Sequence, residues 1–130
     1  MKAMVAILVI LIIFFSVFVG SAVSLSEKLE AYSLEKMEEP KIEKIYYYNI
    51  EYTYLTAKYE RVLKLIETYN ERYGEERDYT SDITFIKART YDRMGDYGTA
   101  MNIYKEYQLK WPEGKKIKTV NDRITHKILL

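Results

Sequence analysis

The sequence predicts an all-α protein, and three observations carry this prediction. Residues 3–19 contain no charged residue and no proline, as expected for a helix that crosses a membrane. In residues 41–73, large apolar side chains recur every three or four positions without Gly or Pro, which is the spacing of one helix face. Residues 46–54 also alternate as a half-buried strand would, but no second strand is available to pair with them. We therefore expect helices throughout the chain.

Residues 1–25 are expected to be a membrane anchor or a signal peptide. The apolar run and its continuation to residue 25 reach the roughly 20 residues that a helix needs to cross a bilayer. Gly20-Ser21-Ala22 has the small side chains that end a cleaved signal, so both interpretations stay open. Lys2 precedes the run and favours an exported C-terminal part, in the periplasm or at the cell surface. We expect membrane contact through residues 3–25, or secretion if this segment is cleaved.

Residues 26–40 are expected to form a short, charged linker helix. Ser24 and Glu27 have the spacing of a capping box, so a polar helix can begin just past the membrane surface. Pro40 is expected to end it. Because the apolar stripe of this helix is thin, we expect a stalk between the anchor and the domain.

Residues 41–130 are expected to form one small helical domain whose core depends on tyrosine. The chain has 14 tyrosines and four phenylalanines, and three of the phenylalanines lie in the apolar N-terminal run. Residues 41–73 form either a hairpin of two helices or one long helix. Further helices are expected over residues 83–94, 98–111 and 115–130, separated by Gly95-Asp96 and by Pro112-Glu113-Gly114.

Residues 84–115 resemble a tetratricopeptide repeat (TPR), which pairs two antiparallel helices. The residues that carry the resemblance are Ala88, Tyr91, Gly95, Ala100, Tyr104 and Pro112. The resemblance implies a close helix crossing at Ala88 and Ala100 and a tight turn at Gly95. A more degenerate copy aligns 38 residues earlier, with Tyr59 matching Tyr97. This offset is similar to the longer repeats of bacterial envelope proteins, and the last helix would act as a cap.

The resemblance also implies where a partner binds. Tetratricopeptide repeats bind extended peptides or helices on the surface lined by the first helix of each pair. The candidate residues, which an amphipathic assignment leaves away from the core, are Tyr47, Asn49, Tyr54, Lys87, Arg89 and Arg93. Exposed aromatic and Arg residues are enriched in binding hot spots. The alternative interpretation is that these residues are ordinary solvated side chains covering the edge of the core.

The composition argues against several other classes of function. The chain has no cysteine, which excludes disulfides, thiolate metal sites and a thiol nucleophile. A net charge of +1 with well-mixed signs lacks the basic footprint of a nucleic-acid-binding protein. His126 has no partner at catalytic or metal-ligand spacing, and there is no phosphate-binding loop or nucleophile elbow. We therefore expect no enzymatic activity, no cofactor and no metal.

These observations lead to the expectation of a non-enzymatic scaffold for protein contacts, displayed outside the cytoplasm on one N-terminal membrane anchor. About two repeats are fewer than a TPR domain normally needs for stability, so we expect self-association or a larger partner. The alternative is a tyrosine-rich glycan-binding module of the cell envelope. A glycan-binding module would gather tyrosines on one exposed surface, whereas a scaffold would bury most of them between helices.

Overall fold

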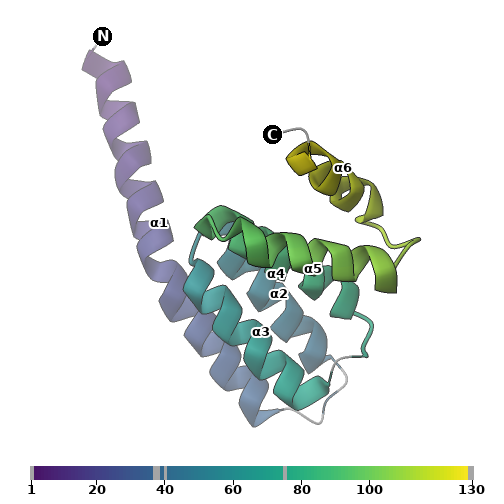
Figure 1. The fold of residues 1–130 in the computed structure, drawn as a ribbon. Coiled ribbons are helices and arrows are strands. Elements are labelled where there is room, and N and C mark those ends of the chain that lie inside the picture. The colour runs from purple at the N-terminus through teal and green to yellow at the C-terminus, as the bar shows by residue number, and fades with distance from the viewer. Residues whose placement is uncertain (1, 37–38, 40, 75, 129–130) are drawn as a thin grey trace.

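The structure is a computed structural model that describes residues 2–36, 39, 41–74 and 76–128. Within these residues the chain is helical and contains no strand, which confirms the all-α prediction. The helices, shown in Figure 1, are α1 (Lys2–Glu35), α2 (Ile42–Leu55), α3 (Tyr59–Tyr73), α4 (Thr80–Met94), α5 (Tyr97–Lys110) and α6 (Ile117–Ile128).

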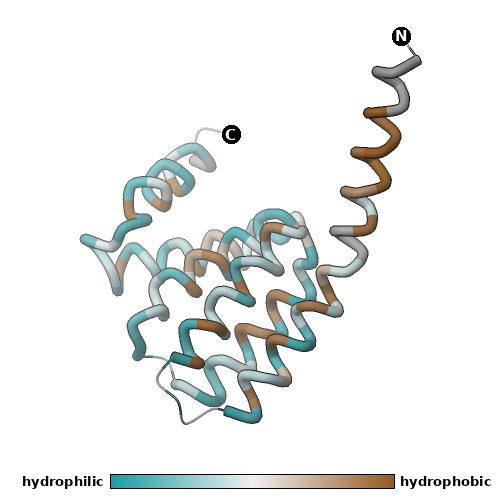
Figure 2. The backbone as a smooth tube through the Cα atoms, turned by 180° about the vertical axis from the view of Figure 1, so that it is seen from behind, coloured by the Kyte–Doolittle hydropathy of each residue, from teal (hydrophilic) through white to brown (hydrophobic). Residues whose placement is uncertain are grey.

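Helix α1 is a single unbroken helix that leaves the helical body as a long rod (Figure 1). The large apolar residues described at positions 7–17 are 47 to 71% exposed, and the projecting part is strongly hydrophobic in Figure 2. The span Ile7–Glu35 is long enough and apolar enough to cross a membrane. A signal sequence near an N-terminus meets the same criterion.

The C-terminal half of α1 packs against α2, which differs from the linker expected over residues 26–40. Ala22, Ser26 and Ser33 are all buried at this contact. The helix also runs through Ser24 and Glu27 without starting there. The linker prediction missed this packing because the buried face consists of small and polar side chains rather than large apolar ones. Pro40, expected to end the helix, lies outside the described residues.

Residues 41–73 form a hairpin rather than one long helix, since α2 and α3 are separated by a tight turn at residues 56–58. Ala57 adopts the left-handed conformation, with a φ of 58°. The backbone N–H of Lys58 donates to the carbonyl of Thr53, which satisfies an end of α2. The turn therefore has the geometry of a helix stop that usually contains Gly.

Helices α4 and α5 form a second hairpin, at the turn that the sequence predicts. Gly95 is left-handed, with a φ of 84°, and ends α4. The side chain of Asp96 then accepts a hydrogen bond from the N–H of Thr99, 3.1 Å away, and caps α5. Ala88 and Ala100 are buried in the core that these helices share.

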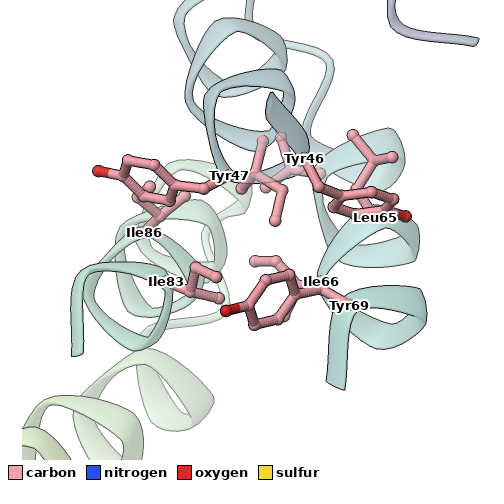
Figure 3. Close-up of a cluster of buried hydrophobic side chains, with 9 residues drawn as sticks. Tyr46, Tyr47, Leu65, Ile66, Tyr69, Ile83 and Ile86 are labelled. Carbon is pink, nitrogen blue, oxygen red and sulfur yellow. The ribbon is translucent and has the colours of Figure 1, made fainter. Parts of the chain in front are cut away.

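The core lies in two neighbouring clusters, both rich in tyrosine. The first joins α2, α3 and α4, and Figure 3 shows its side chains pointing toward one another. The second joins α4, α5 and α6. Among the described residues, four tyrosines are at most 1% exposed: Tyr46, Tyr69, Tyr104 and Tyr107. Burying a large aromatic ring stabilises the fold by about 1.5–3 kcal/mol, so tyrosine supplies much of this core.

The hydroxyl groups of these buried tyrosines find partners at the edge of the core. Tyr46, Tyr69 and Tyr104 donate to carboxylates, and these are Glu30, Glu43 and Asp92 at 3.2, 2.6 and 3.2 Å. The hydroxyl oxygen of Tyr107 accepts from the N–H of Lys116 at 3.2 Å. Each ring can therefore be buried without an unsatisfied polar atom at these four hydroxyls.

Helices α2 and α4 lie side by side and run in the same direction. Near the start of α4, Tyr79 stacks on Tyr47 with 4.6 Å between the ring centroids. Further along, the Nε of Arg89 donates to the hydroxyl of Tyr54 at 3.3 Å. Because the contacts advance along both helices together, the two helices are parallel.

Helix α6 packs mainly on α5, but its side chains also reach α4, and α6 runs in the same direction as α4. Lys116 lies over the ring of Phe85, 5.6 Å from its centroid. Later in both helices, Arg123 donates to both carboxylate oxygens of Asp92 at 2.7 and 2.6 Å. We refer to the surface formed by α2, α4 and α6 as the α2–α4–α6 face.

The turn at Ala57 leads to a stability prediction. Ala57→Gly should raise the free energy of unfolding by about 1 kcal/mol, because a side chain in the left-handed conformation costs roughly 1–2 kcal/mol and glycine relieves it. The matched change Gly95→Ala should lower the free energy of unfolding by a similar amount. A Cβ at Gly95 would meet no atom within 4 Å, so backbone conformation alone would be responsible.

Chemical denaturation followed by circular dichroism of the detergent-solubilised chain measures both changes. Changes of the same sign in the free energy of unfolding of the two variants would contradict the described turns.

Candidate functional site

The α2–α4–α6 face carries an open hollow of about 220 Å³ between α2, α4 and the start of α6. Its lining residues are Tyr47, Glu51, Tyr54, Leu55, Asp82, Phe85, Ile86 and Lys116. Aromatic and aliphatic side chains predominate, while charged groups of both signs contribute to the rim. This combination suits a side chain or short segment that is mainly apolar.

A second hollow, of about 300 Å³, lies further along α4 and is bordered by α6. Its lining residues are Arg89, Asp92, Arg93, Tyr104, Thr119 and Arg123. Three of these side chains are guanidinium groups and one is a carboxylate, so the second hollow is more cationic than the first. Arg89 connects the two hollows, because it bonds Tyr54 and also lies over the ring of Phe85, 5.8 Å from its centroid.

The structure brings three of the predicted binding residues together: Tyr54, Arg89 and Arg93. Tyr54 is half-buried and lies between the two arginines along the boundary of α2 and α4. A hydrogen bond with Tyr54 is the main cause that raises the pKa of Arg93 above its usual value. Arg93 is exposed and remains charged at every physiological pH, so it can meet an anionic group of a partner.

Tyr47 lines the first hollow but is more buried than its assignment away from the core implies. It is 9% exposed, and its hydroxyl donates to Glu51 at 2.7 Å. Burial, aided by the bond to Glu51, raises the pKa of Tyr47. The sequence pattern placed Tyr47 away from the core. Both Tyr47 and its neighbour Tyr46 are buried, because other helices cover α2 on more than one side.

Asn49 is buried at the contact with α1, so its assignment away from the core is wrong. The side chain is 0% exposed, and its Nδ2 donates to the backbone carbonyl of Ser26 at 2.9 Å. The hydroxyl of Thr53 donates to the carbonyl of Asn49 at 2.7 Å and lies within hydrogen-bond distance of the hydroxyl of Ser26, at 3.1 Å. Asn49 therefore joins α2 to α1, which the linker interpretation of residues 26–40 did not anticipate.

Lys87 is separated from the other candidates because it lies on the opposite side of α4. It lines hollows shared with α3, next to Ile66 and Asn70. A ligand on the α2–α4–α6 face would not reach it.

Several residues of the face were missed by the sequence analysis, chiefly Phe85, Asp92 and Arg123. Asp92 and Arg123 are 31 residues apart and form a two-pronged ion pair that holds α6 against α4. A signal existed in the sequence of α6, because Arg123 follows the apolar Val120 by three positions and so lies on its inward side. A cation in such a position needs a carboxylate partner, but the sequence does not identify which one.

The described part of the chain contains no group of three or more His, Cys, Asp or Glu residues that could hold a metal ion. His126 is exposed on α6. The residues that line the two hollows of the face can form hydrogen bonds, ion pairs and apolar contacts.

The ion pair that holds α6 leads to a pH prediction. Hydrogen bonds from Arg123, opposed in part by burial, lower the pKa of Asp92 below its usual value. The pair thus stabilises the fold fully above the usual Asp pKa of about 3.9 and is lost as the pH falls through the lower folded value. Asp92→Asn should cost about 1 kcal/mol of unfolding free energy at pH 7, and this cost should shrink in strong acid.

Denaturant unfolding of the unmodified chain and of Asp92→Asn at neutral and acidic pH measures this difference. Glu43→Gln is the matched control. The pKa of Glu43 is also lowered, mainly by its hydrogen bond from Arg77, but this pair does not involve α6. A cost for Asp92→Asn that does not change with pH would contradict the assignment.

Comparisons of the chain with known protein families, with curated proteins and with solved structures find no match. The TPR resemblance therefore rests on the residues of the repeat itself.

Proposed function

We propose that this chain is a membrane-anchored, non-enzymatic scaffold that binds a protein or peptide partner on its α2–α4–α6 face, outside the cytoplasm. The observation that carries the proposal is the pair of adjoining hollows, one mainly apolar and aromatic, the other bearing three arginines. Aromatic and Arg side chains in partly enclosed positions are the types that dominate binding energy at protein interfaces. A peptide with apolar side chains followed by an acidic group fits this order of chemistry.

The TPR resemblance supports the same surface. Two helical hairpins follow one another, and α2 and α4 are the first helices of the two pairs. Ala88 and Ala100, the small residues expected at the close crossing, are 0% and 1% exposed. The resemblance implies peptide binding on the first helices, and both hollows involve them.

The continuity of α1 supports an uncleaved anchor over a signal peptide. Gly20-Ser21-Ala22, the candidate end of a signal, lies inside the helix, and Ala22 is buried against the domain. Cleavage there would cut the helix that packs on α2. With Lys2 favouring the cytoplasmic side, the domain would lie outside the cytoplasm.

The distribution of tyrosines favours a protein scaffold over a glycan-binding module. Among the described residues, the most exposed tyrosines are Tyr32, Tyr48 and Tyr97, and they lie on three different helices. A stacking platform for sugars needs exposed rings close together, whereas most rings here pack between helices.

The binding proposal predicts that Arg89→Glu together with Arg93→Glu weakens capture of the partner by about tenfold, equivalent to ~1.4 kcal/mol. Capture should also fall as salt rises, because exposed charges act largely through association rate. Pull-down from membranes with the full-length chain, at low and high ionic strength, measures this effect. Self-association would appear as capture of a tagged second copy.

The matched control is Lys28→Glu together with Lys105→Glu, which changes the net charge equally at exposed positions away from the hollows. Helicity should remain unchanged in both double variants. Equal losses of capture in the two double variants would contradict the proposal that the partner binds on the α2–α4–α6 face.

The anchor proposal predicts that protein recovered from membranes keeps its apolar N-terminal segment. Mass spectrometry should detect a peptide that spans the bond between Ala22 and Val23. Recovery of chains that begin at Ser21, Ala22 or Val23, with no spanning peptide, would show cleavage and overturn the anchor.

A further inference from the structure

The turn between α2 and α3 lies at the end of the body from which the apolar part of α1 emerges. Helix α2 runs antiparallel to α1, since Tyr46 bonds Glu30 and Thr53 bonds Ser26. Each residue advances a helix by 1.5 Å. Leu55, two residues beyond Thr53, is therefore level with Ala22 to within about one helical turn.

The turn between α4 and α5 lies at the same end. Helix α4 is parallel to α2, and Arg89 and Arg93 both bond Tyr54 near the end of α2. Met94, which ends α4, and Tyr97, which begins α5, thus follow directly at this end. Figure 1 shows both turns beside α1 where it leaves the body.

Both turns expose apolar side chains where polar ones are usual. Leu55 is 80% exposed, Met94 is 45% exposed and Tyr97 is 51% exposed. Outside α1, the large hydrophobic residues that are exposed in the described part of the chain also include Tyr48 and Leu109. Most of this exposed apolar surface is therefore gathered at one end, and we call Leu55, Met94 and Tyr97 the turn surface.

We infer that the turn surface rests in the headgroup region of the bilayer that α1 spans. This inference depends on the membrane anchor proposed above. Helix α1 has no break between its apolar and packed halves, and an ion pair between Arg61 and Glu30 joins its packed half to α3. The body therefore cannot turn away from the membrane on a loose linker, and the end from which the apolar helix emerges faces the lipid.

The chemistry of the turn surface suits the headgroup boundary. Tyrosine and exposed aliphatic side chains are stabilised there, where an apolar body and a polar tip can both be satisfied. The neighbouring charges balance, with Lys58 and Arg93 set against Glu60 and Asp96. Arg123, whose guanidinium lies over the ring of Tyr97, is paired with Asp92. The contact is thus apolar and aromatic in origin, and it does not require anionic lipid.

The absence of cysteine from the chain permits a direct test. Single cysteines replace Leu55, Tyr97, Leu109 or Ile10 in the full-length protein, which is labelled with bimane and reconstituted in phosphatidylcholine vesicles that contain a headgroup-nitroxide lipid. Leu109 is the matched control: it is 82% exposed, like Leu55, but lies near the far end of α5. Ile10 lies in the apolar half of α1 and reports insertion.

Labels at 55 and 97 should be strongly quenched by the nitroxide lipid, whereas the label at 109 should be quenched no more than a label free in water. If the label at residue 10 is shielded by lipid but the labels at residues 55 and 97 are quenched no more than the label at residue 109, the anchor stands and the turn-surface inference fails. If the label at 10 is itself open to water, the anchor proposal fails.

A second set of vesicles, with phosphatidylglycerol added, separates apolar from electrostatic contact. Quenching at 55 and 97 should be the same in both compositions. Quenching that appears only with the anionic lipid would overturn an apolar contact at the turn surface.

Discussion

The fold depends on a small polar contact between α1 and α2. Asn49, Thr53 and Ser26 are buried, and each forms a hydrogen bond with a polar group of another of the three. A buried amide without a partner would cost about 1–3 kcal/mol, so these groups permit one register between the helices and penalise others. Through this contact, the apolar helix becomes the first helix of the domain. That register places the turn between α2 and α3 at the end of the body from which the apolar half of α1 emerges.

The same principle governs the tyrosine core. A tyrosine ring supplies nearly as much apolar surface as phenylalanine, but its hydroxyl usually needs a partner when it is buried. In this chain the partners are largely carboxylates at the edge of the core, on a different helix from the ring for Tyr46, Tyr69 and Tyr104. Packing and polar satisfaction therefore act together, and a slip of one helix along another would break both.

Local signals made part of this structure predictable from the sequence. Gly95-Asp96 identified the second hairpin because a left-handed Gly followed by a capping Asp is a short-range pattern. The first hairpin stayed ambiguous because Ala57 occupies the position where such patterns have Gly. Tyr54, Arg89 and Arg93 were among the six predicted contact residues because the amphipathic pattern leaves them away from the core, and their role in binding stays a prediction.

The remaining features depend on contacts between distant parts of the chain. The packed half of α1 resembled a stalk because its buried residues are serine and alanine, which hydrophobic periodicity does not detect. Asn49 was misplaced for the same reason, since its partner belongs to that helix. The pair of Asp92 and Arg123 joins residues far apart in sequence, and only the packing of α6 brings them together.

Because α1 is unbroken, it fixes the rotation of the helical body about the helix axis as well as its position along that axis. Each residue turns an α-helix by about 100°, so the angular phase between the apolar half and the packed half is set by the number of residues between them. A contact on one side of the apolar half would therefore fix the direction in which the α2–α4–α6 face points. The helical body and the apolar half of α1 therefore rotate together, because the helix that joins them has no break.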